Sequence, residues 1–332
     1  MNTAILDDYQ NVVRHLDCFP ILAGHNVRVF CERAKGEGQL AVRLRDTEAL
    51  VLIRERTRIT ASLLARLPRL RLLSQTGKVG SHIDLDACTR HGVAVAESQG
   101  HAVSTAEFTW LLILAALRRL PAYMANLYAG QWQRSLPPRP DWPLAGLGDS
   151  LSGKILGVWG YGRIGRLVAG YGRAFDMEVL VHGRAGSLTQ AAADGHLTAA
   201  GRNDFFARCD VITLHLRLLD ETRGCVSADA LARMKPTALL VNTSRAELIA
   251  PGALVSALAA GRPGLAAIDV YEREPIPADE PLLRLPNAIC TPHLGFTERQ
   301  SYERLLSGAF DNVASFARGM PRNIVNAAVL KK

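Results

Sequence analysis

Three side chains of complementary chemistry each follow a short apolar run typical of a strand: Arg245, Glu274 and His293. A planar guanidinium can hold a carboxylate and polarise a neighbouring carbonyl group. An imidazole can supply a proton near neutral pH, and a carboxylate beside it orients the ring and favours its protonated form. These three groups together predict the reduction of a 2-oxo acid, in which the carbonyl oxygen receives a proton as hydride reaches the carbon.

Each residue also has a purely structural interpretation. An arginine at a strand end usually makes a surface ion pair, and a Thr-Pro-His turn can simply hold a capped histidine. Glu274 lies in the charged run 272–274, which is typical of a solvated loop. The functional interpretation requires the three residues to meet. Segments that leave the carboxyl ends of neighbouring parallel strands can do so, because these ends face one crevice.

A glycine motif lies between an apolar strand and a helix. Residues 153–166 contain G-x-G-x-x-G at Gly160, Gly162 and Gly165. The first glycine permits a tight turn, the second lets the backbone approach a pyrophosphate, and the third lets helix and strand pack closely. The diphosphate of a dinucleotide would rest on N–H groups at the helix N-terminus. In this strand–turn–helix context the motif predicts binding of a dinucleotide, with a chance glycine turn as the alternative.

The end of the next strand bears on cofactor choice. An acid there would bind the ribose hydroxyls of NAD, but the sequence continues with His182, Gly183 and Arg184. A glycine followed by arginine removes repulsion and supplies a cation, which suits a 2′-phosphate. The sequence therefore favours NADP slightly over NAD, with a solvated loop arginine as the alternative.

Strand-like apolar runs alternate with helix-like stretches along the chain, which predicts an α/β fold of two doubly wound parallel sheets. Ser104 to Glu107 match a capping box that would start a helix ended by Pro121, and Thr297 would start a second helix. Residues 121–150 are predicted to form an irregular connector. The strand runs begin at residues 4, 27, 50, 70, 93, 155, 179, 211, 238, 266 and 288.

The bulk composition excludes several classes of function. The chain of 332 residues is long enough for two domains, and its apolar runs are too short to cross a membrane. The N-terminus lacks the pattern of a signal peptide, so a cytoplasmic location is expected. The formal charge of +8 is spread over arginines without a basic block, which argues against a nucleic-acid partner. The six cysteines form no C-x-x-C pair, and no metal site is expected.

The ordered set of motifs resembles the D-isomer-specific 2-hydroxyacid dehydrogenases, a family that includes glyoxylate/hydroxypyruvate reductases and phosphoglycerate dehydrogenases. The resemblance runs over nearly the whole chain. It is carried by residues 242–245 (Asn-Thr-Ser-Arg), 269–275 (Asp-Val-Tyr-Glu-Arg-Glu-Pro) and 292–295 (Pro-His-Leu-Gly), together with the glycine motif.

The resemblance implies a role for each matching residue. Arg245 would bind the substrate, His293 would be the acid/base, and Glu274 would pair with that histidine. Further positions would face the cofactor or the substrate. The cofactor-binding residues would be Gly160, Gly162, Arg163, Ile164, Gly165, Gly183, Arg184, Leu216, Arg217, Thr243, Ser244, Asp269 and Gly295, and the substrate-binding residues Arg54, Lys78, Val79 and Gly80.

The resemblance also implies the architecture. A Rossmann-type NAD(P)-binding domain, residues 100–296, would be inserted into a flavodoxin-like substrate domain of residues 1–99 and 297–332. A homodimer that contacts through the inserted domain is expected, as is a small 2-oxo or 2-hydroxy acid as substrate. A nucleotide-binding sensor, similar to the corepressors related to this family, is the alternative function.

Three departures from the family pattern qualify these expectations. Gly183 stands where an acid is frequent, Arg217 where proline is frequent, and Glu97 near a usual asparagine. No further domain is expected after the last predicted helix, unlike in many phosphoglycerate dehydrogenases, and this expectation disfavours phosphoglycerate as the substrate.

Overall fold

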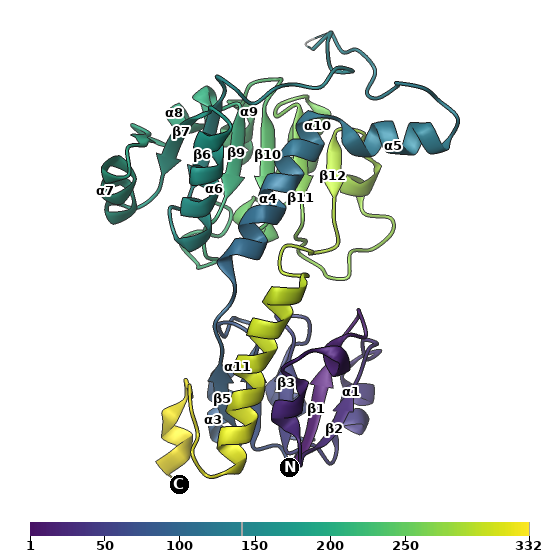
Figure 1. The fold of residues 1–332 in the computed structure, drawn as a ribbon, viewed down its shortest axis with the longest axis vertical. Coiled ribbons are helices and arrows are strands. Elements are labelled where there is room, and N and C mark those ends of the chain that lie inside the picture. Colours follow the sequence, from purple (N-terminus) through teal and green to yellow (C-terminus); the bar gives the residue numbers. More distant parts are fainter. Residues whose placement is uncertain (141, 332) are drawn as a thin grey trace. The chain divides into compact units, whose positions relative to one another are not determined.

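The chain folds into two compact units in the computed structural model, which describes residues 1–140 and 142–331. Unit 1 comprises Met1–His101 and Glu298–Lys332, and unit 2 comprises Ala102–Thr297 (Figure 1). The sequence placed the crossings between the units one or two residues earlier. The structure keeps His101 with unit 1, where its Nδ1 lies 3.5 Å from Oε1 of Glu298.

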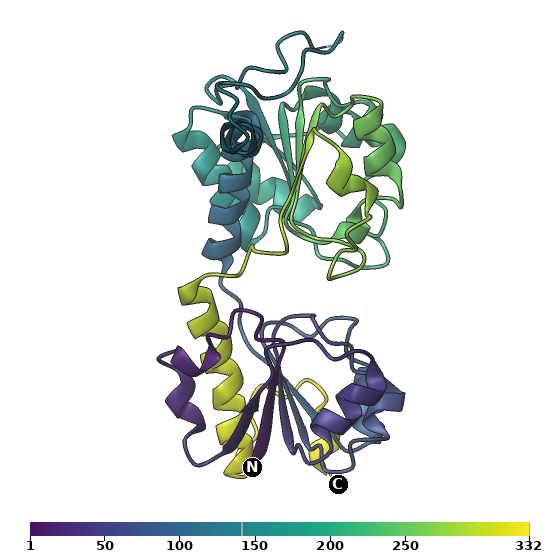
Figure 2. The ribbon, with the colours of Figure 1, turned by 90° about the vertical axis from the view of Figure 1, so that its right-hand side faces the viewer.

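Unit 1 is built on a five-stranded parallel sheet in the order β2-β1-β3-β4-β5. β3 is buried and apolar along its whole length, because helices cover both faces of the sheet. Figure 2 shows α11 on one face and α1 on the other. The strands are β1 (Asn2–Leu6), β2 (Asn26–Val29), β3 (Ala49–Leu52), β4 (Leu72–Gln75) and β5 (Ala94–Glu97). The helices are α1 (Glu37–Leu44), α2 (Ala61–Leu64), α3 (Leu85–Arg90) and α11 (Arg299–Ala317), with 3-10 turns η1 (Val13–His15), η2 (Phe19–Leu22) and η5 (Ala327–Lys331).

Unit 2 is built on a seven-stranded parallel sheet in the order β12-β11-β10-β9-β6-β7-β8. One core packs α4 and α6 against the sheet, and a second core lies on the opposite face beneath α8, α9 and α10. The strands are β6 (Ile155–Trp159), β7 (Glu178–His182), β8 (Leu197–Thr198), β9 (Val211–Leu214), β10 (Leu239–Asn242), β11 (Leu265–Ile268) and β12 (Ala288–Cys290). The helices are α4 (Ala102–Leu117), α5 (Leu120–Tyr128), α6 (Arg163–Ala174), α7 (Ala185–Ala193), α8 (Arg202–Arg208), α9 (Ala228–Ala232) and α10 (Ala253–Ala259), with turns η3 (Ala246–Leu248) and η4 (Pro281–Arg284). The two parallel α/β sheets are the fold class predicted from the sequence.

The helix starts differ from the predicted ones. Ser104 is not an N-cap, because α4 already begins at Ala102 and the Ser104 hydroxyl donates to the carbonyl of Gly295. The N-cap of α11 is Glu298 rather than Thr297, and its carboxylate accepts from the N–H groups of residues 300 and 301. At α4 a tertiary contact takes the place of the local cap, whereas at α11 the cap is local but lies one residue later than predicted.

The stretch after α4 also differs from the predicted connector. α4 ends at Leu117, and Pro121 lies in the first turn of α5, where its missing N–H costs nothing. Smaller differences concern β4, which lies two residues later than predicted, and the two-residue strand β8, which was not predicted. Within the described residues no single helix could cross a membrane by length and apolar character, although α4 and α5, bent by 63° at their junction, pass that test together.

Candidate active site

Four segments that carry candidate residues leave the sheet of unit 2 at its carboxyl edge. The glycine motif follows β6, and residues 243–245, 269–274 and 291–295 follow β10, β11 and β12. The chain runs from β6 through β7 to one side of the sheet and returns to β9 on the other side. Such a reversal opens a crevice at the carboxyl ends of the strands, where ligands of open α/β sheets bind.

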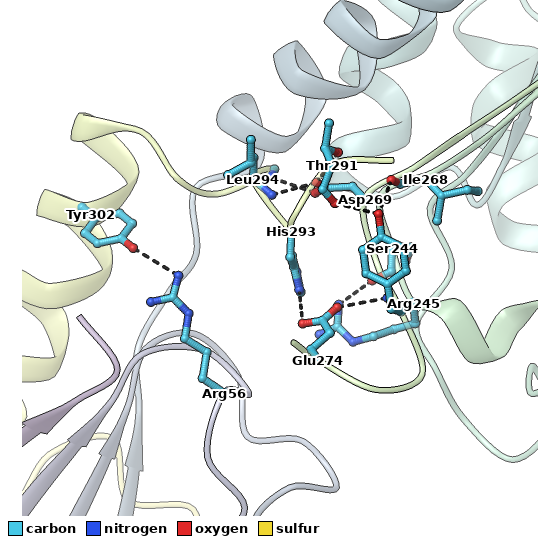
Figure 3. A network of polar contacts seen from close by, with 12 residues as sticks. Arg56, Ser244, Arg245, Ile268, Asp269, Glu274, Thr291, His293, Leu294 and Tyr302 are labelled. Atoms are coloured by element: carbon cyan, nitrogen blue, oxygen red, sulfur yellow. Dashed lines mark hydrogen bonds and ion pairs between the residues drawn. The ribbon is translucent and has the colours of Figure 1, made fainter. Parts of the chain in front are cut away.

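His293 and Glu274 form a hydrogen-bonded pair at this edge. The ring Nδ1 of His293 lies 2.8 Å from Oε2 of Glu274 (Figure 3). The other carboxylate oxygen accepts the N–H of Tyr271 at 3.1 Å, and the imidazole packs edge-on against Phe296. Because Nδ1 is engaged by the carboxylate, Nε2 is the ring nitrogen suited to exchange a proton with a ligand.

The charge of Glu274 is set by its neighbours. Burial alone would raise the pKa of this carboxyl group, but several groups outweigh burial and hold the pKa below its ordinary value of 4.5. They are the hydrogen bond and charge of His293, the N–H of Tyr271 and the charge of Arg245. Glu274 is therefore ionised at neutral pH, and an ionised carboxylate favours a protonated imidazole beside it.

Arg245 joins this pair from the end of β10. The side-chain N–H of Asn242 donates to the carbonyl of Arg245 at 2.8 Å, which fixes the backbone of this arginine. The Nη1 of Arg245 donates to the carbonyl of Ser244 at 2.6 Å. Figure 3 shows the guanidinium next to Glu274, in line with its effect on the pKa of that carboxyl group. The guanidinium, imidazole and carboxylate thus lie together within unit 2.

Asp269 holds the segment that carries His293. It is fully buried, and its Oδ1 accepts the hydroxyl of Thr291 and the N–H of Leu294, each at 2.7 Å. Its Oδ2 accepts the N–H of Gly295 at 2.9 Å. Burial raises the pKa of Asp269 in spite of these hydrogen bonds. The bonds fix a turn in which His293 adopts a φ of +55°, a conformation that few non-glycine residues adopt.

Further hydrogen bonds connect the neighbouring segments. The hydroxyl groups of Thr243 and Thr109 lie 2.7 Å apart, which fixes the residue after β10 against α4. The hydroxyl of Ser244 donates to the carbonyl of Leu216 at 2.6 Å, so the segments after β10 and β9 are joined. Gly295, through its contact with Ser104, lies against the start of α4. These contacts make the carboxyl edge a preorganised surface.

The three glycines of the motif differ in what surrounds them. A Cβ on Gly160, whose φ is +101°, would lie 2.7 Å from the carbonyl oxygen of His215, and a Cβ on Gly165 would lie 2.1 Å from that of Gly160. A Cβ on Gly162 would meet nothing within 4 Å. The fold itself thus requires the first and third glycines. The second, directly before α6, leaves space that a pyrophosphate can fill.

The remaining cofactor candidates line both sides of β6. Arg163 begins α6 and is exposed, and Ile164 packs against the core beneath α4. Gly183 and Arg184 follow β7, with Arg184 exposed at the N-cap of α7. Leu216 and Arg217 follow β9, and Arg217 is also exposed. Two exposed cations thus follow the two strands that neighbour the glycine motif.

The candidate substrate residues of unit 1 lie after β3 and β4. Arg54 has a φ of +56°, and its N–H donates to the hydroxyl of Thr76 at 2.7 Å. The side chain of Gln75 donates to the carbonyl of Arg54 at 3.0 Å, so the segment after β3 is bound to the end of β4. The loop with Lys78, Val79 and Gly80 follows directly. No group of three or more potential metal ligands occurs in the part of the chain that the structure describes.

Comparison with known proteins identifies the group to which this chain belongs. Residues 110–295 match the family model described as "D-isomer specific 2-hydroxyacid dehydrogenase, NAD binding domain". The chain belongs to that family. It is an oxidoreductase that uses a nicotinamide cofactor, and the matched residues place cofactor binding in unit 2.

Relatives of this dehydrogenase act on more than one acid. It is 39% identical over 279 residues to a glyoxylate reductase of Aeropyrum pernix, and the match covers 82% of each chain. It is 32% identical to a D-3-phosphoglycerate dehydrogenase of Archaeoglobus fulgidus, of which it spans 51%. Among solved structures, a phosphoglycerate oxidoreductase from Vibrio cholerae is 52% identical with a TM-score of 0.90, over 96% of this chain and 99% of that one.

Several residues that support the dehydrogenase site were not singled out from the sequence. Thr291 anchors the turn of His293 on Asp269, and the N–H of Tyr271 holds Glu274. In unit 1, Gln75 and His82 form a buried contact of 3.1 Å beneath the loop after β4. A polar residue beside a motif is the one signal that could have indicated them, and it is weak because such residues are common in loops.

Proposed function

We propose that this dehydrogenase reduces a small 2-oxo acid to the corresponding D-2-hydroxy acid, with glyoxylate or hydroxypyruvate as the first substrates to test. The observation that carries the proposal is the His293–Glu274 pair beside Arg245, at the carboxyl edge of a unit that binds a nicotinamide cofactor. The similarity to glyoxylate reductases supports the choice of acid.

The residues at the edge fit the cofactor and the reaction. The open space at Gly162 and the N-terminus of α6 would receive the diphosphate, and residues 243, 244, 269 and 295 would lie along the cofactor. The bound cofactor supplies hydride to the keto carbon. Arg245 would hold the substrate carboxylate and polarise the carbonyl group. His293 would donate the Nε2 proton to the carbonyl oxygen, with Glu274 stabilising the imidazolium before transfer.

Unit 1 would contact the same substrate carboxylate as Arg245. We assign this contact to the loop Lys78, Val79 and Gly80, through backbone N–H groups other than that of Val79, which Glu97 accepts, with Arg54 as a further substrate-facing residue. Two observations support this assignment: the loop follows β4 at the carboxyl edge of its sheet, and Arg54 is held to that strand end by Gln75. Carboxyl edges of open parallel sheets are where such ligands bind.

Cofactor choice rests on the residues after β7 and β9. The exposed Arg184 and Arg217 can bind a 2′-phosphate, and no carboxylate stands at positions 182–184 to bind the ribose hydroxyls of NAD. The proposal therefore favours NADPH over NADH by a small margin.

The first prediction tests the reaction and the role of His293. The purified enzyme, supplied with NADH or NADPH, should oxidise the cofactor with glyoxylate or hydroxypyruvate and form the D-hydroxy acid where the product is chiral. His293→Ala should lower kcat by at least about 100-fold, because the proton donor is lost. Its dissociation constant for the cofactor should stay near the wild-type value.

Three outcomes would count against parts of this proposal. Tight cofactor binding without turnover on any acid of a 2-oxo acid panel, a phosphorylated acid included, would favour a nucleotide sensor. Unchanged turnover in His293→Ala would remove this residue from its role. A lower KM for NADH than for NADPH would reverse the cofactor preference.

A further inference from the structure

Glu97 and Lys78 connect the candidate substrate loop to the neighbouring strand of unit 1. Glu97 is the last residue of β5 and lies opposite Gln75, the last residue of β4. Its Oε1 forms an ion pair with Nζ of Lys78, and its Oε2 accepts the N–H of Val79 at 3.4 Å. One carboxylate thus holds two consecutive residues of the loop.

The position of this carboxylate is fixed from the backbone. The N–H of Glu97 donates to the carbonyl of Asn323 at 3.1 Å, and the side chain of Asn312 donates to the carbonyl of Glu97 at 3.1 Å. The glutamate side chain is only 19% exposed, whereas that of Lys78 is 66% exposed. The carboxylate is therefore the more buried partner of the ion pair, and the ammonium group is the more exposed one.

The loop is fastened a second time at its start. The N–H of Gly77 donates to the hydroxyl of Ser98 at 2.9 Å, and the N–H of Ser98 donates to the carbonyl of Gly77 at 3.0 Å. Glu97 therefore contacts the two residues that follow a well-anchored glycine.

A carboxylate at this place has an electrostatic consequence. The negative charge of Glu97 lies against a loop whose N–H groups are proposed to bind the negative carboxylate of the substrate. Two like charges a few ångströms apart repel each other, and the repulsion grows when water is excluded from between them. The ammonium group of Lys78 cancels this charge. It lies at a cavity of about 390 Å³ that is also lined by Arg304, an exposed second cation.

We propose that Glu97 and Lys78 work as one unit, in which Glu97 positions the substrate loop and Lys78 neutralises the charge that Glu97 brings to an anion-binding site. The inference rests on the proposed role of the loop in binding the substrate carboxylate. Glu97 is a positioning residue, because it acts through the backbone of the loop. Lys78 acts through the charge of its ammonium group, and neither side chain needs to touch the reacting atoms.

The experiment compares neutral variants of the pair in the full-length enzyme with saturating reduced cofactor. Lys78→Met leaves Glu97 without its counter-charge, so the KM for glyoxylate should rise about tenfold at low salt. The rise in KM should be smaller in 0.5 M salt, where the Debye length is only about 4 Å and charges are screened more strongly. The KM for the cofactor should not change, since the cofactor binds unit 2.

The double variant Lys78→Met/Glu97→Gln provides the decisive comparison. It has no charge at either position and keeps an amide oxygen that can accept the N–H of Val79, so the KM should fall back towards the wild-type value. Arg69→Met is the matched control. It removes one positive charge from an exposed ion pair of unit 1, in which Arg69 Nη1 and Asp46 Oδ1 lie 3.4 Å apart, and should leave the KM unchanged.

A direct binding measurement separates this inference from the proposed function. The dissociation constant of oxamate, a 2-oxo acid analogue that is not reduced, should show the same order among the variants. A wild-type enzyme that reduces no 2-oxo acid would overturn the proposed function alone. If Lys78→Met binds oxamate as Arg69→Met does, or the double variant binds no better than Lys78→Met, the charge-compensation inference is wrong. The melting temperature of each variant reports whether it is folded.

Discussion

At the scale of single residues, the site illustrates how neighbours set the behaviour of a side chain. Glu274 alone in a charged loop would be an ordinary surface carboxylate. In the structure it is placed between the N–H of Tyr271 and the ring of His293, with Arg245 near enough to lower its pKa. The same side chain thereby has a pKa below its ordinary value and is a negative charge beside the imidazole ring at neutral pH.

Glu274→Gln tests that counter-charge. The amide keeps the size of the side chain but stabilises the protonated imidazole much less, so kcat/KM for reduction should fall by about 100-fold. Glu272→Gln, an exposed neighbour in the same run, is the control and should leave kcat/KM unchanged.

The same pKa shift gives a pH dependence of stability. Because folding lowers the pKa of Glu274, the unfolded chain binds the proton of this carboxyl group more tightly than the folded chain does. The ionised carboxylate therefore stabilises the fold at pH values above its ordinary pKa of 4.5. This contribution is lost as the pH falls through the lower pKa of the folded state. The melting temperatures of the wild type and of Glu274→Gln should therefore approach each other as the pH is lowered into the acid range. Curves that stay parallel from pH 7 to acid would contradict this assignment.

At the scale of elements, the turn between β6 and α6 separates the demands of folding from those of binding. Gly160 and Gly165 have no room for a Cβ, whereas Gly162 has ample room. Its backbone, with φ −90° and ψ −159°, also suits any residue. The space beside Gly162, which the fold leaves open, would be filled by the diphosphate of a bound cofactor.

Gly162→Ala should therefore fold normally and bind cofactor poorly. We expect the melting temperature to stay within a few degrees of the wild type and the dissociation constant for NAD(P)H to rise about tenfold or more, because a methyl group occupies the path of the diphosphate. Gly165→Ala should instead lower the melting temperature.

Gly170 provides the control on the same helix. Its Cβ would also meet nothing, so Gly170→Ala should stabilise α6 by about 1 kcal/mol without affecting cofactor binding. Wild-type cofactor affinity in Gly162→Ala, measured by fluorescence titration, would show that the diphosphate does not lie at this turn.

At the scale of the whole molecule, apolar side chains remain exposed on one part of unit 2. They lie on α4, on α5, which buries none of its residues, and on the segment that follows. Exposed apolar side chains that lie close together mark association surfaces. The residues are Leu111, Leu120, Met124, Leu127, Tyr128, Trp132, Leu144 and Leu147. We therefore propose a homodimer that contacts through this surface.

Leu127→Asp tests the dimer. A charge placed in a buried apolar interface is costly, so the variant should shift towards the monomer mass in light scattering coupled to size-exclusion chromatography. Val42→Asp, on the exposed face of α1 in unit 1, is the matched control and should keep the wild-type mass. A monomeric wild type, or a Leu127→Asp variant that remains dimeric, would be evidence against this surface.

The sequence by itself determined the alternation of strands and helices, the glycine motif and the three residues of the proposed chemistry. Continuous apolar strands such as β3 follow from burial on both faces, and a turn that excludes Cβ atoms at positions 160 and 165 demands glycine, so both leave a mark in the local pattern. The predicted preference for NADP was also inferred from the local sequence, at Arg184 after β7.

Only the tertiary structure decided how the site is held. That Asp269 fixes the turn of His293, that Ser104 bonds to Gly295 rather than capping α4, and that Glu97 meets both Lys78 and Val79 depend on contacts between residues 18 to 191 positions apart. Local sequence carries no record of such contacts, because one polar side chain has many possible partners until packing of the core brings a particular one within hydrogen-bond distance.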